Sequence, residues 1–326
     1  MAQHLLNAGP SERGWHRIEG ASRCLRLHAW RESGAMPKVE TEPLIKGSLL
    51  HIGLAHYYVR MNRDDPDYYY SPEDAVRKLS AVGAREASTA HAAALWRVSA
   101  PNIILSLQAY EARWRNCGWE PVMVEEELRA HIPKYNGDGK FLFTQRADLA
   151  VRDSDGIHWI VDHKSCYRIE SKTLRQHILS GQFLGYQLFG RKLWGDNFGG
   201  VIVNRVKLSQ PYGFDRTVLE PAPSAIKLFA KNLALQERMV DMFEGKPPLE
   251  WPAVYSDQTC WGKYGKCDAF ELCQWGEPDA VCEESRQEEA RQEVGKKDQG
   301  SPREEKQGSP QGNQGGSSLK GGRDSC

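Results

Sequence analysis

The sequence predicts a mixed α/β fold in which a central sheet is flanked by helices. Three strand-like runs lie between residues 121 and 164 and are separated by glycine-containing turns, as in an antiparallel meander. Apolar residues at helical spacing precede and follow these runs, and a further apolar run comes after the second helical region. The order helix, three strands, helix, strand (αβββαβ) buries a sheet between helical layers.

Composition excludes several classes of protein. With 326 residues the chain is long enough to bury a large core, and its 43 basic and 43 acidic residues leave no overall charge that would attract nucleic acid. No apolar run has the length of a membrane span, and the first residues lack the pattern of a signal peptide. We therefore expect a cytoplasmic protein that does not contact membranes.

Helices are expected from apolar spacing and from capping residues. Ser71, followed by Pro72 and two acids, is typical of a helix start, and Ser224 is expected to cap the last long helix. Pro101 is expected to break or kink the helix that contains it. The expected ranges are 21–32, 46–61, 72–82, 86–116, 174–193 and 224–243.

Strands are expected at 121–133, 141–152, 157–164 and 199–208. The segments 136–139 (Asn-Gly-Asp-Gly) and 153–156 (Asp-Ser-Asp-Gly) are the turns between the first three.

The chain is expected to have four parts. They are an N-terminal segment (1–45), a main α/β core (46–250) with a helical insertion at about 60–118, a cysteine-rich segment (251–282) and a polar tail (283–326). The tail has too few apolar residues to offset the entropy of ordering it, so we expect it to be disordered.

The second and third strands carry a candidate cation site. Because side chains alternate along a strand, Asp162 and Lys164 share one face and His163 lies on the other. Asp148 on the neighbouring strand adds a second carboxylate, and two carboxylates beside a lysine suit a hard cation and phosphate chemistry. A surface hairpin with an ordinary aspartate and lysine fits these residues equally well.

Two helices carry further candidates. His51 lies in an apolar helix, where a lone histidine is more often a hydrogen-bonded core residue than a metal ligand. Gln182 and Tyr186 are four residues apart and so share a helix face, from which an amide and a phenol can contact a phosphate. The alternative for this pair is a helix that packs on the sheet with its polar tips exposed.

The cysteines favour metal or redox use over disulfides, since no export signal is present. Cys260, Cys267 and Cys273 lie within fourteen residues, and the distant Cys24 is a candidate fourth ligand. Four thiolates can hold an iron–sulfur cluster or a zinc ion. Cys282 is a rival fourth ligand, and three buried, inert cysteines are the alternative.

Together these residues resemble the PD-(D/E)XK nuclease superfamily, in particular its RecB-like branch of AddB-type, CRISPR-associated and phage-encoded exonucleases. The resemblance covers roughly residues 22–275. Members carry a histidine on an early helix, an aspartate on the second strand, a D/E-x-K on the third and a Q-x-x-x-Y on the next helix. The matching residues are His51 in GSLLHIGLAH, Asp148 in QRADLAV, Asp162 and Lys164 in VDHKS, and Gln182 and Tyr186 in QFLGY.

The resemblance implies a Mg²⁺- or Mn²⁺-dependent DNA nuclease, more an exonuclease than an endonuclease, in recombination, repair or phage DNA processing. Its substrate would be single-stranded DNA or duplex ends, with a recombination protein as a possible partner. The implied metal ligands are His51, Asp148, Asp162 and the backbone carbonyl of His163. Lys164 would support the nucleophile, and Gln182 and Tyr186 would position the strand. Further candidates are a carboxylate among Glu125, Glu126 and Glu127, and phosphate contacts from Arg146, Arg168, Lys172 and Arg175.

The resemblance also assigns the cysteines. Iron–sulfur members of this branch close a [4Fe–4S] cluster with one cysteine before the core and three after it, the order shown by Cys24, Cys260, Cys267 and Cys273. The usual C-x-x-C step is replaced here by six residues between Cys260 and Cys267, so zinc stays an alternative. A non-catalytic DNA-binding or recombination-partner module with the same fold is the alternative function.

Overall fold

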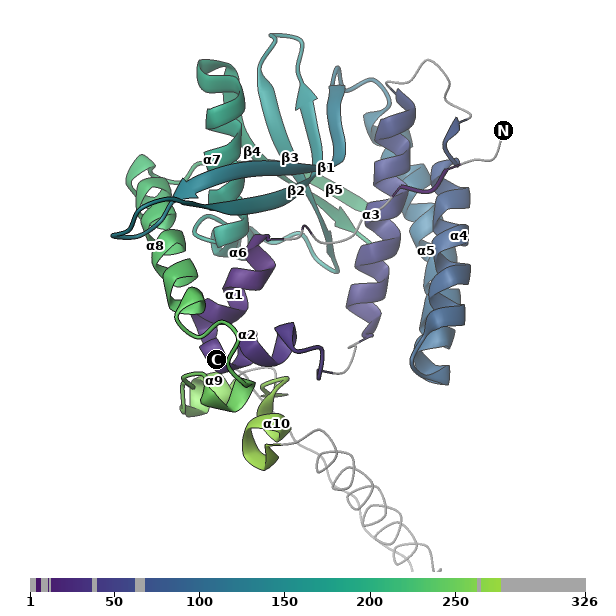
Figure 1. Cartoon of the computed structure of the whole chain (residues 1–326). Helices are drawn as coiled ribbons and strands as arrows, with labels where there is room; N and C mark the ends of the chain where they lie inside the picture. The colour runs from purple at the N-terminus through teal and green to yellow at the C-terminus, as the bar shows by residue number, and fades with distance from the viewer. Residues whose placement is uncertain are drawn as a thin grey trace, which may run out of the picture. The chain divides into compact units, whose positions relative to one another are not determined.

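The computed structural model describes residues 4–6, 11, 13–36, 40–61, 68–262 and 265–276. A mixed sheet with helices on both faces dominates it (Figure 1), which confirms the predicted fold class. The tail from 283 onward and Cys282 lie outside the described residues. No helix in the described part of the chain is both long and apolar enough to cross a membrane.

Five strands form the main sheet in the order β1-β2-β3-β4-β5. Their bounds are Glu120–Pro133, Lys140–Arg152, His158–Cys166, Phe198–Lys207 and Gly213–Leu219. Only β3 and β4 are parallel, and the other neighbours are antiparallel. The sequence did not predict β5, because this short edge strand (GFDRTVL) is largely polar and lacks the apolar run that identifies β4.

The strands β2 and β3 separate part-way along their length, and we call the point where they separate the fork. The two strands pair only where Leu149–Arg152 faces His158–Val161. Beyond that point β2 continues beside β1, while β3 continues beside β4. Asp148 and Asp162 are the first residues past the last pair, so both carboxylates lie where the sheet splits.

One face of the sheet is covered by α3 (Glu42–Met61) and α5 (Ala90–Trp114), and α4 (Pro72–Glu86) packs on these two helices. Ser71 caps α4 as predicted, since its hydroxyl accepts from the Asp74 N–H at 3.1 Å. The expected break at Pro101 is wrong, because α5 continues through it. Pro101 is exposed, so water can solvate the carbonyl that loses its helical hydrogen bond there.

The opposite face is covered by α7 (Gly181–Trp194) and α8 (Pro223–Asp241). The single helix predicted over 174–193 is in fact two, α6 (Ser171–His177) and α7, which Ile178–Ser180 separate. A short 3-10 turn, Gly195–Asn197, leads from α7 into β4. Ser224 is not the cap of α8: Ala222 is the N-cap residue, and Pro223 occupies the first turn, where its missing N–H costs nothing.

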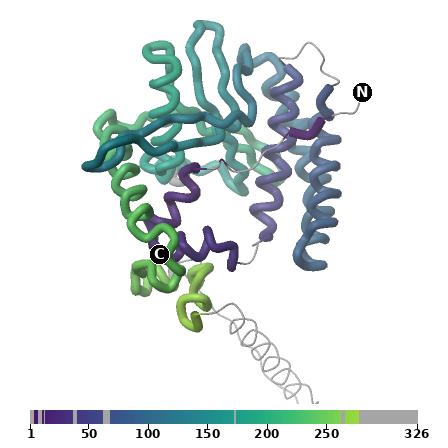
Figure 2. Tube along the Cα trace, viewed as in Figure 1, coloured from purple at the N-terminus to yellow at the C-terminus, as the bar shows by residue number. Residues whose placement is uncertain are grey.

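The first two helices lie beside the last described segment, below the sheet (Figure 2). The helix predicted over 21–32 is broken into α1 (Trp15–Arg23) and α2 (Leu25–Glu32) by an extended Cys24. The Arg26 N–H donates to the Pro252 carbonyl at 3.0 Å. The remaining elements are the 3-10 turn Pro248–Glu250, α9 (Asp257–Cys260), a small hairpin of β6 (Trp261–Gly262) and β7 (Gly265–Lys266), and α10 (Phe270–Trp275).

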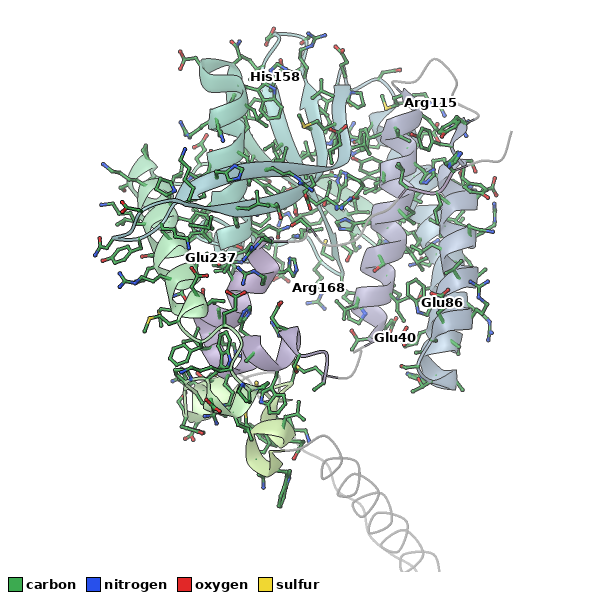
Figure 3. All side chains as sticks on the ribbon, in the orientation of Figure 1. Glu40, Glu86, Arg115, His158, Arg168 and Glu237 are labelled. Carbon is green, nitrogen blue, oxygen red and sulfur yellow. The ribbon has the colours of Figure 1, made fainter. Side chains whose placement is uncertain are left out.

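An ion pair joins the N-terminal helices to the core. Glu237 on α8, labelled in Figure 3, accepts from the guanidinium of Arg17 on α1, and both side chains are at least 90% buried. Since a buried charge without a partner is strongly destabilising, this pair fixes α1 against α8.

Candidate active site

Three ligand atoms gather at the fork. One atom each from His51 on α3, Glu125 on β1 and Asp148 on β2 lies within 4.8 Å of the other two. The His51 Nδ1 is 3.3 Å from the Asp148 Oδ2. Two carboxylates and an imidazole at such separations are a donor set that suits a divalent cation. The predicted metal ligands His51 and Asp148 are therefore brought together, and Glu125 joins them.

Asp148 is held in place by the broken ladder itself. Its Oδ2 accepts from the backbone N–H of His163 at 2.8 Å. That N–H lies beyond the last β2–β3 pair, so the carboxylate satisfies a donor near the point where the ladder stops. The fork thus both exposes Asp148 to the site and orients it.

Glu125 has an unusual backbone. Its φ of +52° places it in the left-handed region, which costs a residue with a side chain about 1 kcal/mol or more. Its neighbours Val124 and Glu126 pair with Leu149 and Ala147, so Glu125 lies opposite Asp148. The sequence offered Glu125, Glu126 and Glu127 as alternatives. Glu126 is exposed and Glu127 pairs with Arg129 at 2.8 Å, which leaves Glu125 as the one at the site.

A second group of predicted residues meets on β3 and α7. The Lys164 Nζ is 2.8 Å from the Asp162 Oδ2 and donates to the Gln182 Oε1 at 3.2 Å. The Gln182 amide donates to the Asp162 Oδ1 at 2.8 Å and to the Tyr186 hydroxyl at 3.3 Å. The Tyr186 hydroxyl donates to the Arg146 carbonyl at 2.7 Å, which holds α7 against β2.

Burial and neighbouring charges shift the pKa values of the titratable groups at the site. Burial raises the pKa of Glu125 to about 8, and the charge of Asp148 adds to this effect. Burial alone would lower the pKa of His51, but Asp148 and Glu125 raise it to about 9. Burial also raises the pKa of Asp162 to about 6, although Lys164 opposes it. A divalent cation would displace these protons, as metal binding usually does.

The sequence did not predict that α1 forms one wall of the cavity at the site. It measures about 280 Å³ and is lined by the ligand set, by Gln182 and Tyr186, and by Trp15, His16 and Glu19 of α1. Nothing in the local sequence of α1 distinguishes these residues from an ordinary amphipathic helix. Only the contact of α1 with α7 and α8 brings them here.

The remaining predicted residues have different surroundings. The His163 ring lies on the opposite face from Lys164, as the strand alternation predicted, and stacks on Tyr58 at 5.8 Å between ring centroids. The Arg146 guanidinium donates to the Glu125 carbonyl at 3.0 Å, so it supports the site. Arg168 and Arg175 are exposed, and the side chain of Lys172 lies outside the described residues.

The four predicted cysteines line a separate cavity. Cys24, Cys260, Cys267 and Cys273 are free thiols around a space of about 320 Å³. Burial raises the pKa of the Cys273 thiol, and neighbouring Cys24 and Cys267 add to the rise. No three sulfur atoms of the described cysteines lie within 4.8 Å of one another. A zinc ion with thiolates at about 2.3 Å would need them closer together.

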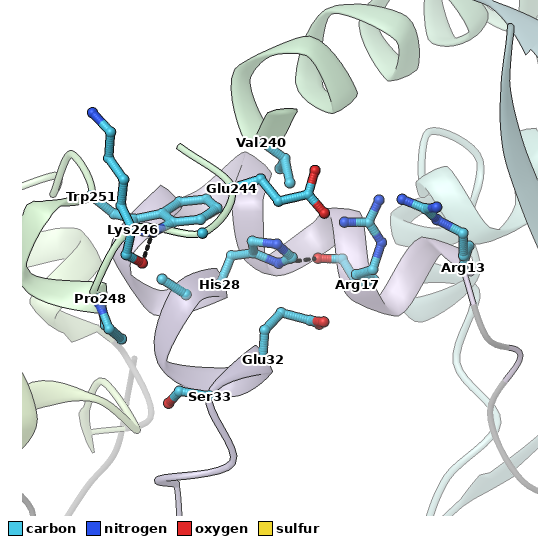
Figure 4. A pocket seen from close by; sticks show the side chains of 12 residues that line it. Arg13, Arg17, His28, Glu32, Ser33, Val240, Glu244, Lys246, Pro248 and Trp251 are labelled. Atoms are coloured by element: carbon cyan, nitrogen blue, oxygen red, sulfur yellow. Dashed lines mark hydrogen bonds between the residues drawn. The ribbon is translucent and has the colours of Figure 1, made fainter. Parts of the chain in front are cut away.

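A third cavity, of about 500 Å³, lies between α1, α2 and the end of α8 (Figure 4). His28 contacts the Arg17 carbonyl there at 3.2 Å, and the Trp251 indole N–H donates to the Lys246 carbonyl at 3.0 Å. Its basic side chains face Glu32 and Glu244, so it lacks the concentrated negative charge of the fork.

Comparison with known proteins gives distant likenesses. No protein-family model matches the chain, and no curated protein matches its sequence. The chain is similar to the crystal structure of a candidate exonuclease from Eubacterium rectale, with a TM-score of 0.42 and 11% identity, covering 79% of this chain and 86% of that one. It is also similar to the crystal structure of SSO0001, with a TM-score of 0.29 and 13% identity, covering 63% and 87%. Neither likeness bears on the chemistry of this chain, which rests on the side chains at the fork.

Proposed function

We propose that this chain is a metal-dependent DNA nuclease of the PD-(D/E)XK superfamily, in its RecB-like branch. The observation that carries the proposal is the juxtaposition of His51, Glu125 and Asp148 with the Asp162–Lys164 pair at one fork. A retired site has no physical need to keep two buried carboxylates with raised pKa values beside a strained backbone. Cation ligands beside a lysine are a combination that suits metal-assisted phosphodiester hydrolysis.

The residues divide into two roles. Mg²⁺ or Mn²⁺ would be held by His51, Glu125 and Asp148. Asp162 would supply a further carboxylate ligand. An ion held there would lower the pKa of an attacking water and would neutralise charge on the phosphate oxygens. Lys164, whose side chain is 31% exposed, orients that water or donates to a phosphate oxygen. Gln182 fixes both Asp162 and Lys164 through its amide, and Tyr186 fixes Gln182.

Nuclease assays test this proposal directly. The protein is incubated with end-labelled single- and double-stranded DNA in Mg²⁺ or Mn²⁺, beside Asp162→Ala and Lys164→Ala variants and an Asp155→Ala control. Asp155 lies in the exposed β2–β3 turn, away from the fork. We expect cleavage by the parent and the control only, and equal cleavage by all four proteins would refute the assignment. Binding without metal-dependent cleavage would indicate the non-catalytic module instead.

The same assay distinguishes an exonuclease from an endonuclease. We propose an exonuclease that acts on DNA during recombination, repair or phage DNA processing. A covalently closed circular substrate should stay intact while a linear copy of it is degraded. Nicking of the circle would make the enzyme an endonuclease, and the order in which end labels are released gives its polarity.

We further propose that Cys24, Cys260, Cys267 and Cys273 hold a [4Fe–4S] cluster. What supports this is that all four thiols line one cavity. In a cluster each thiolate binds a different iron. Protein purified without oxygen should be brown and contain iron and sulfide. A colourless preparation with one zinc per chain would replace the cluster by zinc.

A further inference from the structure

A row of polar side chains crosses the α3–α5 face of the sheet behind the metal site. His163 on β3 pairs in register with Asn204 on β4, and Asn204 pairs with Arg216 on β5. His163 and Asn204 are at most 1% exposed, and this face is otherwise packed with residues such as Val161 and Ile202. Burying polar groups in such a layer is costly unless they are hydrogen-bonded.

Two tyrosines form hydrogen bonds with members of this row. The Asn204 amide nitrogen donates to the Tyr110 hydroxyl at 2.9 Å and lies 2.8 Å from the His163 Nδ1. The hydroxyls of Tyr58 and Tyr110 are 2.6 Å apart. The Arg216 guanidinium donates to both hydroxyls at 3.0 Å. Five side chains from three strands and two helices therefore form one connected network.

Arg216, the member of this network farthest from the metal site, is held between two tryptophan rings. The Arg216 guanidinium carbon lies 3.7 Å from the ring centroid of Trp114 and 3.6 Å from that of Trp119. Two indole rings at such distances hold a guanidinium by cation–π attraction and restrict its movement. Arg216 is therefore a rigid anchor for the hydroxyls of Tyr58 and Tyr110.

The near end of the network reaches the metal site. The His163 ring stacks on Tyr58 with an interplanar angle of 8° and meets His51 edge-on, with 6.1 Å between centroids. His51 and Tyr58 are two turns apart on α3 and so share one face of the helix. The backbone N–H of His163 holds Asp148. His163 thus touches both the helix that carries one ligand and the side chain of another.

We propose that Asn204, Tyr110, Tyr58 and Arg216 are positioning residues that hold His163 against both His51 and Asp148 and so set the affinity of the site for Mg²⁺ or Mn²⁺. The inference rests on the proposed function for the identity of the ion. It does not require that the protein cleave DNA. Hydrogen-bonded partners that orient metal ligands typically contribute 10- to 100-fold in metal affinity.

Calorimetric titration of the full chain with Mn²⁺ tests this inference. Asn204→Leu removes the amide that joins His163 to Tyr110 at a similar volume, and Tyr110→Phe removes one oxygen atom. Tyr57→Phe is the matched control, because the Tyr57 ring packs edge-on against Tyr58 and Tyr110. We expect the Kd for Mn²⁺ to rise about 10- to 100-fold in Asn204→Leu, less in Tyr110→Phe, and to stay unchanged in the control.

Thermal unfolding of each protein without metal separates positioning from folding. If Asn204→Leu does not fold, Tyr110→Phe decides the question. An unchanged Kd in a folded Asn204→Leu or Tyr110→Phe protein overturns the inference, as does a rise in Kd that only parallels the loss of Tm in all three variants. A parent that binds Mn²⁺ without cleaving DNA would refute the nuclease proposal but leave the inference standing. A parent that binds no Mn²⁺ would refute both.

Discussion

The fork and the cysteine cavity are two candidate metal centres built in opposite ways. At the fork, sheet register and a helix bring the donors within 4.8 Å of one another, and buried hydrogen bonds orient them. Around the cysteine cavity, four thiols come from a helix break and from short elements, and their sulfurs stand apart. A centre built by a sheet is preformed, whereas one built by short segments depends on its ligand to close. The two should respond differently when a donor is removed.

The largest effect is expected at the fork. Asp148→Asn keeps the volume and a hydrogen-bond acceptor for the His163 N–H but removes the charge that faces His51. We expect DNA cleavage to fall about 100-fold or more and Mn²⁺ binding to weaken. Asp155→Asn is the control. Retention of full activity by Asp148→Asn would remove this residue from the site.

A cysteine substitution should show the reverse pattern. Cys24→Ser should reduce the iron content and lower the Tm of the loaded protein by about 5–10 °C, because ligation joins segments more than 200 residues apart and stabilises only the folded chain. Mn²⁺ affinity at the fork should change little. Cys117→Ser, three residues after the end of α5, is the matched control for iron content. Equal loss of Mn²⁺ affinity and of Tm in Cys24→Ser would show that the two centres form one folding unit.

The titratable groups at the fork make the stability of the folded protein depend on pH. Without metal, the folded-state pKa values of Glu125 and His51 are about 8 and about 9, above the ordinary values of 4.5 and 6.5 for these side chains. The folded state therefore holds protons that the unfolded state releases, so this contribution to stability is lost as the pH rises from about 5 to 9. Mn²⁺ displaces the same protons, so the Tm increase caused by Mn²⁺ should grow with pH over this range. In Asp148→Asn the increase should be small at every pH.

The smallest effect separates strain from function within the fork. Glu125→Gly relieves a φ of +52° and removes a buried carboxyl group, so we expect the metal-free protein to gain about 1 kcal/mol of stability. The same change should weaken Mn²⁺ binding. Asn136→Gly is the control, since Asn136 has a φ of +46° in an exposed turn far from the ligands. A stability loss in Glu125→Gly would mean that the carboxyl group holds β1 in place.

The sequence predicted what depends on local pattern. Period-2 runs with Asn-Gly and Asp-Gly turns located β1, β2 and β3, and the alternation correctly separated His163 from Lys164. It did not reveal β5, the break at Cys24 or the continuous α5, because tertiary packing decides these over propensity.

The residues of the candidate site likewise fall into those that the local sequence pattern predicted and those that depend on tertiary packing. The four-residue step in α7 predicted that Gln182 and Tyr186 share a face, and they do meet Asp162 and Lys164. Glu125 was not separable from Glu126 and Glu127, because a left-handed φ and the split of a ladder leave no trace in residue type. The wall on α1 and the network behind His163 depend on contacts between segments distant in sequence. Asn204 was the visible clue, as an amide within an apolar strand.

The position of α1 has a consequence for the order of folding. Its residues wall the active-site cavity, yet Arg17 pairs with a glutamate 220 residues later, and Arg23 contacts the carbonyl of Thr259. During synthesis, α1 can therefore take up its final position only after almost all of the described chain has left the ribosome. The sheet and its acids can assemble earlier, but the cavity stays without its wall. Under the proposed function, the contacts of α1 with Glu237 and Thr259 would therefore also determine when the cavity becomes able to bind its substrate.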